Sequence, residues 1–165
     1  MNNTKIIQLQ WEGPYNLDQL PILTNEEIDY GVYQIYGKQP IYGHDVLLYL
    51  GQANEQTFGK RIAQERWRDT NDSNNHKIYV GRIIGETKPS NLEWFEEITL
   101  AEQLLIAVHK PAFNSKSLFA NFNLKLQNIH ILNWGNYRDL FPEVSGLRWS
   151  NANFEIESEV YKWEG

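Results

Sequence analysis

The stretch DYGVYQIYG, residues 29–37, decides the fold together with YLG at residues 49–51. The first stretch concentrates aromatic and β-branched residues in a short run, which predicts a strand at 30–36. Pro and Gly punctuate the residues 38–45, which predicts a hairpin connection to a second strand at 46–51. Tyr33 and Tyr49 therefore lie on neighbouring strands, either as ordinary sheet residues or as side chains aimed at one reacting atom.

Three segments that follow complete the predicted core. TFGKRIAQERWRD at 57–69 has helical spacing, and KIYVGRII at 77–84 reads as a third strand. A long helix is predicted at 90–109, where Ser90 and Glu93 form a capping box and Pro111 ends the pattern. This order predicts an α/β fold, a small sandwich with a central three-stranded, mainly antiparallel sheet flanked by helices.

The flanking segments are predicted to extend this core. At 165 residues the chain is expected to form one globular unit. Residues 1–28 read as a leader packed on the domain, with a short strand at 5–9. Residues 118–165 read as a C-terminal extension with a strand at 128–132 and a turn at 133–136. The aromatic residues of this extension form either core or a stacking surface.

Composition bounds the function. The net charge of -6 argues against bulk electrostatic coating of nucleic acid, although six basic residues lie within 23 positions. They form either one anion-facing surface or a solvated helix face: Lys60, Arg61, Arg66, Arg68, Lys77 and Arg82. Cysteine is absent, and neither a secretory signal nor an apolar run long enough for a membrane span is present, so a cytoplasmic protein is expected.

One acidic residue departs from the pattern of the long helix. On a helical wheel Glu102 falls within the apolar stripe that contains Ile98, Ala101 and Leu105. A buried carboxylate without a partner is costly, so this position indicates either a functional acid or a helix-edge Glu that bends outward.

Together these residues resemble the GIY-YIG nuclease family. GVY at 31–33 and YLG at 49–51 resemble its paired signature, with Val and Leu in place of the usual Ile. FGKRI supplies Arg61 on the following helix, and AEQLLIAVHKPAFN supplies Glu102 and Asn114. The resemblance spans residues 29–117.

The resemblance implies a divalent-metal-dependent endonuclease that hydrolyses phosphodiester bonds, with DNA as the expected nucleic-acid partner. Glu102 would hold a single Mg²⁺ or Mn²⁺ ion, a hard cation that prefers oxygen ligands. Tyr33 is the candidate general base, and Tyr49 would bind the attacking water or the phosphate. Arg61 suits the charge of a phosphate, with Lys60 beside it to steer the substrate. Asn114 would tie the helix end to the site, unless it is a simple turn residue.

Two questions stay open at this point. Many members of the family carry His or Tyr four residues after the Arg, and this chain has Glu65 there. The alternative is therefore a catalytically silent module of the same fold that binds nucleic acid or protein. If the chain is an enzyme, target choice comes from loops such as 38–45 and 69–76, or from a partner protein or oligomer.

Overall fold

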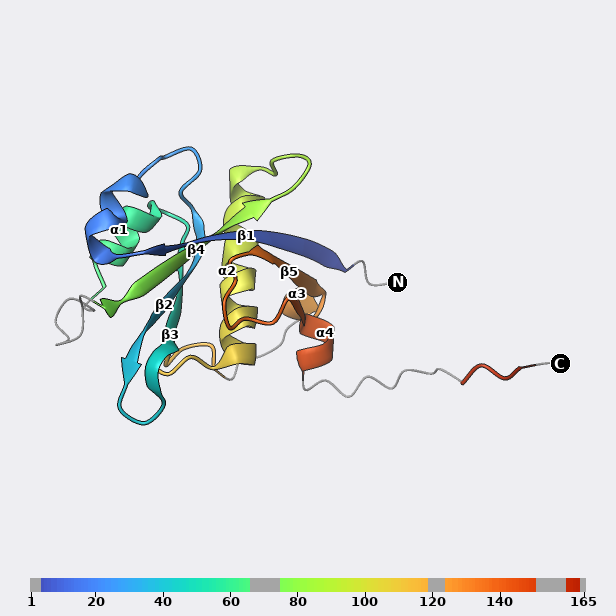
Figure 1. Ribbon diagram of the computed structural model, residues 1–165. Coiled ribbons are helices and arrows are strands. Elements are labelled where there is room, and N and C mark those ends of the chain that lie inside the picture. Colours follow the sequence, from blue (N-terminus) through green and yellow to red (C-terminus); the bar gives the residue numbers. More distant parts are fainter. Residues whose placement is uncertain (1–3, 66–74, 119–123, 151–159, 164–165) are drawn as a thin grey trace.

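The computed structural model describes residues 4–65, 75–118, 124–150 and 160–163. Its centre is one curled, mixed sheet of six strands in the order β3-β2-β4-β1-β5-β6 (Figure 1). The strands are β1 (Lys5–Tyr15), β2 (Gly31–Gln39), β3 (Gly43–Ala53), β4 (Lys77–Ile84), β5 (Ile129–Gly135) and β6 (Glu143–Ser145). The helices are η1 (Leu17–Ile22), α1 (Phe58–Ala63), α2 (Asn91–His109), α3 (Leu124–Gln127) and α4 (Gly146–Trp149).

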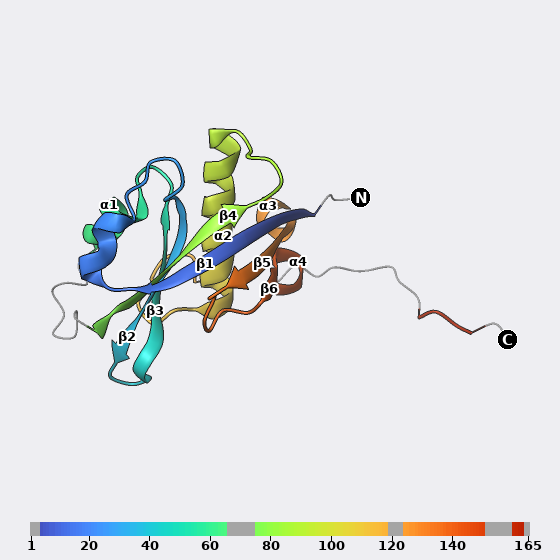
Figure 2. The ribbon, with the colours of Figure 1, turned by 45° about the horizontal axis from the view of Figure 1, so that its top comes forward.

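The α/β class is confirmed, but the predicted three-stranded sheet is wrong. The expected strands β2, β3 and β4 do form an antiparallel unit, in which β2 pairs with both neighbours. The sheet then continues, because β1 pairs antiparallel with β4 and parallel with β5. Strands from both flanking segments thus belong to the same sheet as the predicted core (Figure 2).

The physical reason for the larger sheet is the period-2 pattern of β1. Ile7, Leu9 and Trp11 alternate with polar residues and are at most 1 % exposed. The strand at 5–9 was therefore predicted too short. The expected turn at 133–136 also begins too early, because Asn133 and Trp134 still belong to β5.

Helices cover both faces of the sheet, as the sandwich prediction required. Long α2 packs against one face, where its Ile98, Leu104 and Leu105 join a buried cluster with β1 residues (Figure 1). Short η1 and α1 pack against the other face over the β2–β4 region, where Leu20 and Phe58 meet a second cluster. Successive residues of β2 point to opposite faces, so Val32 belongs to the first cluster and Tyr33 to the second.

The N-terminus of α2 has the predicted capping box. Ser90 Oγ accepts from the backbone N–H of Glu93, and the Glu93 carboxylate accepts from the backbone N–H of Ser90. This is the expected capping box. Within the described part of the chain, no helix is long and apolar enough to cross a membrane.

Candidate active site

The two signature tyrosines lie side by side on the α1 face of the β2–β3 hairpin. Tyr33 on β2 pairs across the strands with Gly51, and Ile35 pairs with Tyr49 on β3. The Tyr33 and Tyr49 rings are 6.1 Å apart between centroids. Tyr33 is fully buried, whereas Tyr49 is partly buried. The expectation that neighbouring strands bring both tyrosines together is therefore confirmed by the geometry.

Both glycines of the signature are required by close approach. A Cβ on Gly51 would overlap the Tyr33 ring and hydroxyl and lie 2.7 Å from Tyr49 Cε1. Gly31 has φ of +152°, and a Cβ there would overlap the carbonyl oxygen of Gly81 on β4. Only glycine avoids a Cβ at these positions. Gly51 therefore permits the close approach of the two tyrosines, and Gly31 permits the close approach of β2 to β4.

Arg61 on α1 and Glu65 just after this helix bring charge to the tyrosine pair. Glu65 lies just beyond the last helical turn, and its Oε1 is 2.9 Å from the Arg61 guanidinium. The same Oε1 accepts a hydrogen bond of 3.0 Å from the Tyr33 hydroxyl. Glu65, which replaces the His or Tyr expected at this position, thus connects Arg61 directly to Tyr33.

This environment keeps the Tyr33 phenol protonated. Burial raises its pKa far above the ordinary value of 10.0, and the negative charge of Glu65 raises it further. Arg61 acts in the opposite direction but is outweighed. The pKa of Tyr49 is also raised, first by burial and then by the charges of Glu65 and Glu102. In the resting site Tyr33 is therefore a hydrogen-bond donor rather than a phenolate.

Glu102 lies on α2, close enough to Tyr49 for its negative charge to raise the pKa of that tyrosine. Glu102 is partly buried, and burial raises its pKa to about 7 against the lowering effect of Arg61 and Lys116. Gln52 on β3 donates from Nε2 to Glu102 Oε2 at 3.0 Å. The apolar stripe thus holds an acid that faces the tyrosine hairpin instead of bending into solvent.

Asn114 fastens the segment after α2 to the edge of the sheet. Its Oδ1 accepts from the backbone N–H of Leu50 at 3.0 Å, and its Nδ2 donates to the Leu50 carbonyl at 2.9 Å. The backbone N–H of Phe113 donates to the Leu48 carbonyl beside it. Since Leu50 adjoins Tyr49, the predicted tie between helix end and candidate site is present in the structure.

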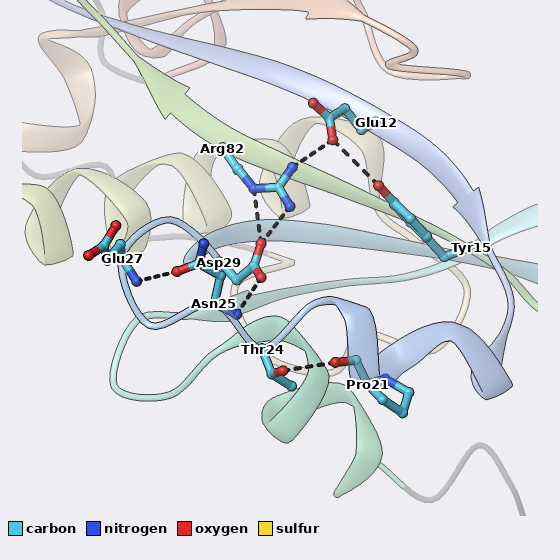
Figure 3. Close-up of polar contacts among 8 residues, drawn as sticks. All are labelled: Glu12, Tyr15, Pro21, Thr24, Asn25, Glu27, Asp29 and Arg82. Carbon is cyan, nitrogen blue, oxygen red and sulfur yellow. Dashed lines mark hydrogen bonds and ion pairs between the residues drawn. The ribbon is translucent and has the colours of Figure 1, made fainter.

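Two of the predicted basic residues point elsewhere. Lys60, predicted to steer substrate, pairs with Glu26 at 2.9 Å on the exposed surface. Arg82 lies on β4 and pairs with Asp29, which is 2 % exposed, and with Glu12 (Figure 3). Its ion pairs hold the loop before β2, so Arg82 is part of the structural support. Arg66 and Arg68 lie outside the described residues.

Sequence reasoning missed the polar network between β3 and α2. Gln52 bridges the two elements, since its Oε1 accepts from Asn54 Nδ2 at 3.0 Å and from Thr99 Oγ1 at 2.9 Å. Gln52 follows the YLG signature directly, and Thr99 lies three residues before Glu102. The period-2 alternation of side chains along β3 could have predicted this contact, because it places Gln52 on the face of the sheet that α2 covers.

The donor set fits a single hard cation. Glu102 Oε1 has no hydrogen-bond partner among the residues that the structure describes, so one carboxylate oxygen is open to a ligand. Mg²⁺ commonly takes one or two protein carboxylates and completes its shell with water and phosphate oxygens. No group of three His, Asp or Glu side chains forms a multi-ligand metal site within the same described ranges.

No protein-family model, no curated protein and no solved structure matches the chain.

Proposed function

We propose that the protein is a divalent-metal-dependent endonuclease of the GIY-YIG type that hydrolyses phosphodiester bonds in DNA. The supporting observation is the convergence of Tyr33, Tyr49, Arg61 and Glu102 from four different elements. The charge of Arg61 lowers the pKa of Glu102, and the charge of Glu102 raises the pKa of Tyr49. The rings of Tyr33 and Tyr49 are close enough to contact each other.

Phosphodiester hydrolysis needs stabilisation of the phosphoryl oxygens and removal of a proton from the attacking water. Arg61 is one-third exposed, and its planar guanidinium has donors left over after pairing with Glu65. Those donors bind the phosphate oxygens of the substrate. Tyr49 donates its hydroxyl to the same phosphate or to the attacking water, and the buried Tyr33 holds Glu65 in place.

Glu102 would hold the Mg²⁺ or Mn²⁺ ion, which supplies charge neutralisation at the phosphate when bound. Gln52 orients the carboxylate by its hydrogen bond to Oε2. Because the pKa of Glu102 is about 7, the ionised form that a cation requires becomes dominant above that pH. Asn114 bonds to Leu50 and so fixes the position of β3, and with it Tyr49, relative to the end of α2.

The test is a cleavage survey with supercoiled plasmid, branched DNA and single-stranded RNA, each with Mg²⁺, with Mn²⁺ and with EDTA. We expect metal-dependent nicking of DNA that EDTA abolishes. Cleavage of RNA alone would change the substrate class and keep the chemistry. If all three substrates stay intact with both metals, the nuclease assignment is wrong.

The second candidate is a silent module that binds nucleic acid or protein. Glu65 is the observation that favours it, because its carboxylate already occupies one side of Arg61 and competes with a phosphate for that guanidinium. DNA binding measured in a gel-shift assay, together with no cleavage in the survey, would support this candidate.

A further inference from the structure

Glu65 has contacts that indicate a role for it in the proposed nuclease reaction, and this role rests on the proposed function. Its Oε1 is engaged twice, by the Tyr33 hydroxyl at 3.0 Å and by Arg61 at 2.9 Å. Among the described residues no hydrogen bond or ion pair engages the other oxygen, Oε2. The side chain is 19 % exposed. One oxygen is thus fixed by two donors while the carboxylate keeps contact with solvent.

Tyr33 lacks this contact. Its side chain is fully buried, and its single proton points at Glu65. A water molecule therefore reaches the carboxylate more readily than the phenol oxygen. The raised pKa of Tyr33 agrees with this arrangement, because the phenol stays protonated.

We infer that Glu65, rather than a tyrosine, accepts the proton of the attacking water, and that Tyr33 is its positioning residue. The water O–H bond breaks, its proton goes to Glu65 Oε2, and the water oxygen forms the new bond to phosphorus. The bond to the leaving oxygen breaks, and that oxygen keeps the electron pair and takes a proton from solvent. Glu65 then returns its proton to solvent.

The charged and titratable groups around Glu65 suit this role. Arg61 faces Glu65 from α1, Tyr33 from β2 and Tyr49 from β3. Glu102 on α2 interacts electrostatically with the same arginine and with Tyr49. Because Arg61 can bind phosphate with its remaining donors, it places the acceptor carboxylate next to the reacting phosphorus.

The experiment compares single-turnover cleavage of DNA by wild type, Glu65→Gln and Tyr33→Phe, with DNA affinity measured separately. Glu65→Gln keeps an oxygen that accepts from Tyr33 but cannot take a proton. We expect it to lower the cleavage rate by about 100-fold or more with DNA affinity retained, as loss of a general base does. Tyr33→Phe keeps the ring and the carboxylate, and we expect a loss of about 10-fold or less from poorer positioning.

Glu65→His places a different proton acceptor at the same position, and we expect this variant to recover part of the cleavage rate that Glu65→Gln loses. Glu55→Gln is the matched control, because it removes an exposed charge ahead of α1. The inference is overturned if Tyr33→Phe loses as much rate as Glu65→Gln, or if Glu65→Gln cleaves like wild type. Both of those outcomes leave the proposed nuclease intact, whereas an inert wild type overturns function and inference together.

Discussion

Asn114 binds both backbone groups of Leu50, accepting from its N–H at 3.0 Å and donating to its carbonyl at 2.9 Å. Leu50 lies on β3, which is an edge strand of the sheet. The asparagine therefore acts as a one-residue extension of the sheet and closes an edge that would otherwise expose unpaired groups. The same two bonds fix the strand that carries Tyr49.

Asn114→Ala should destabilise the protein. Both Leu50 groups are buried, so they lose their partners and gain no water. We expect the free energy of unfolding in urea to fall by about 2–4 kcal/mol. Asn136→Ala is the control, because Asn136 is exposed and makes one side-chain bond to Gly13. Equal losses in the two variants would show that the Leu50 bonds carry no special weight.

Gly51→Ala should disturb the tyrosine pair without unfolding the protein. The added methyl group overlaps Tyr33, so the ring must shift or the hairpin must bend. We expect a loss of about 1–3 kcal/mol of stability, as in other overpacked sites. Nuclease activity should fall as well. Gly85→Ala is matched to it, since the nearest atom to a Cβ at Gly85 is 3.9 Å away, and it should behave like wild type.

The buried ion pair of Arg82 and Asp29 should matter more than its exposed counterpart. Asp29→Asn leaves the arginine without its main charge partner and weakens the loop before β2 (Figure 3). Breaking a buried pair on one side costs about 3–5 kcal/mol, whereas an exposed pair contributes about 0–1 kcal/mol. Glu26→Gln, which breaks the exposed pair with Lys60, is therefore the control. Thermal melts of the two variants should differ clearly; identical melting temperatures would contradict the assignment of Arg82 to structural support.

Glu102 should make stability depend on pH in metal-free buffer. Its folded-state pKa of about 7 lies above the ordinary 4.5, so between these values the folded state holds a proton that the unfolded state has lost. Stability contributed by this group therefore falls as pH rises from about 4.5 to 7. We expect Glu102→Gln to exceed wild type by on the order of 2 kcal/mol at pH 8 and to match it near pH 4. A constant difference across this range would mean that Glu102 is not buried as described.

The sequence predicts the parts of this fold that depend on neighbours along the chain. The β2–β3 hairpin, β4 and the capped helix α2 all follow from local composition and periodicity. The parallel pairing of β1 with β5 does not, because it joins residues more than 100 positions apart. Trp11 Nε1, for example, donates to Asn133 Oδ1 at 2.8 Å, and no local pattern indicates that contact.

The candidate site divides in the same way. Residue types and order indicated Tyr33, Tyr49, Arg61, Glu102 and Asn114. In the structure the two tyrosine rings lie side by side, and Arg61 and Glu102 both act electrostatically on Tyr49. Asn114 binds the backbone of Leu50, next to Tyr49. The contacts of Glu65 and Gln52 depend on where α1 ends and on which face of β3 meets α2. Such relationships are three-dimensional, so the sequence could mark Glu65 only as a departure from the family pattern.

The most direct test of the nuclease proposal is metal-dependent nicking of supercoiled plasmid by wild type, Glu102→Gln and Glu96→Gln. Glu96 lies on the same helix and pairs with Lys125 on the exposed surface, so its variant controls for lost charge. We predict that wild type and Glu96→Gln nick the plasmid with Mg²⁺ and that Glu102→Gln is slower by about 100-fold or more. Nicking that survives in Glu102→Gln at the wild-type rate would contradict the account.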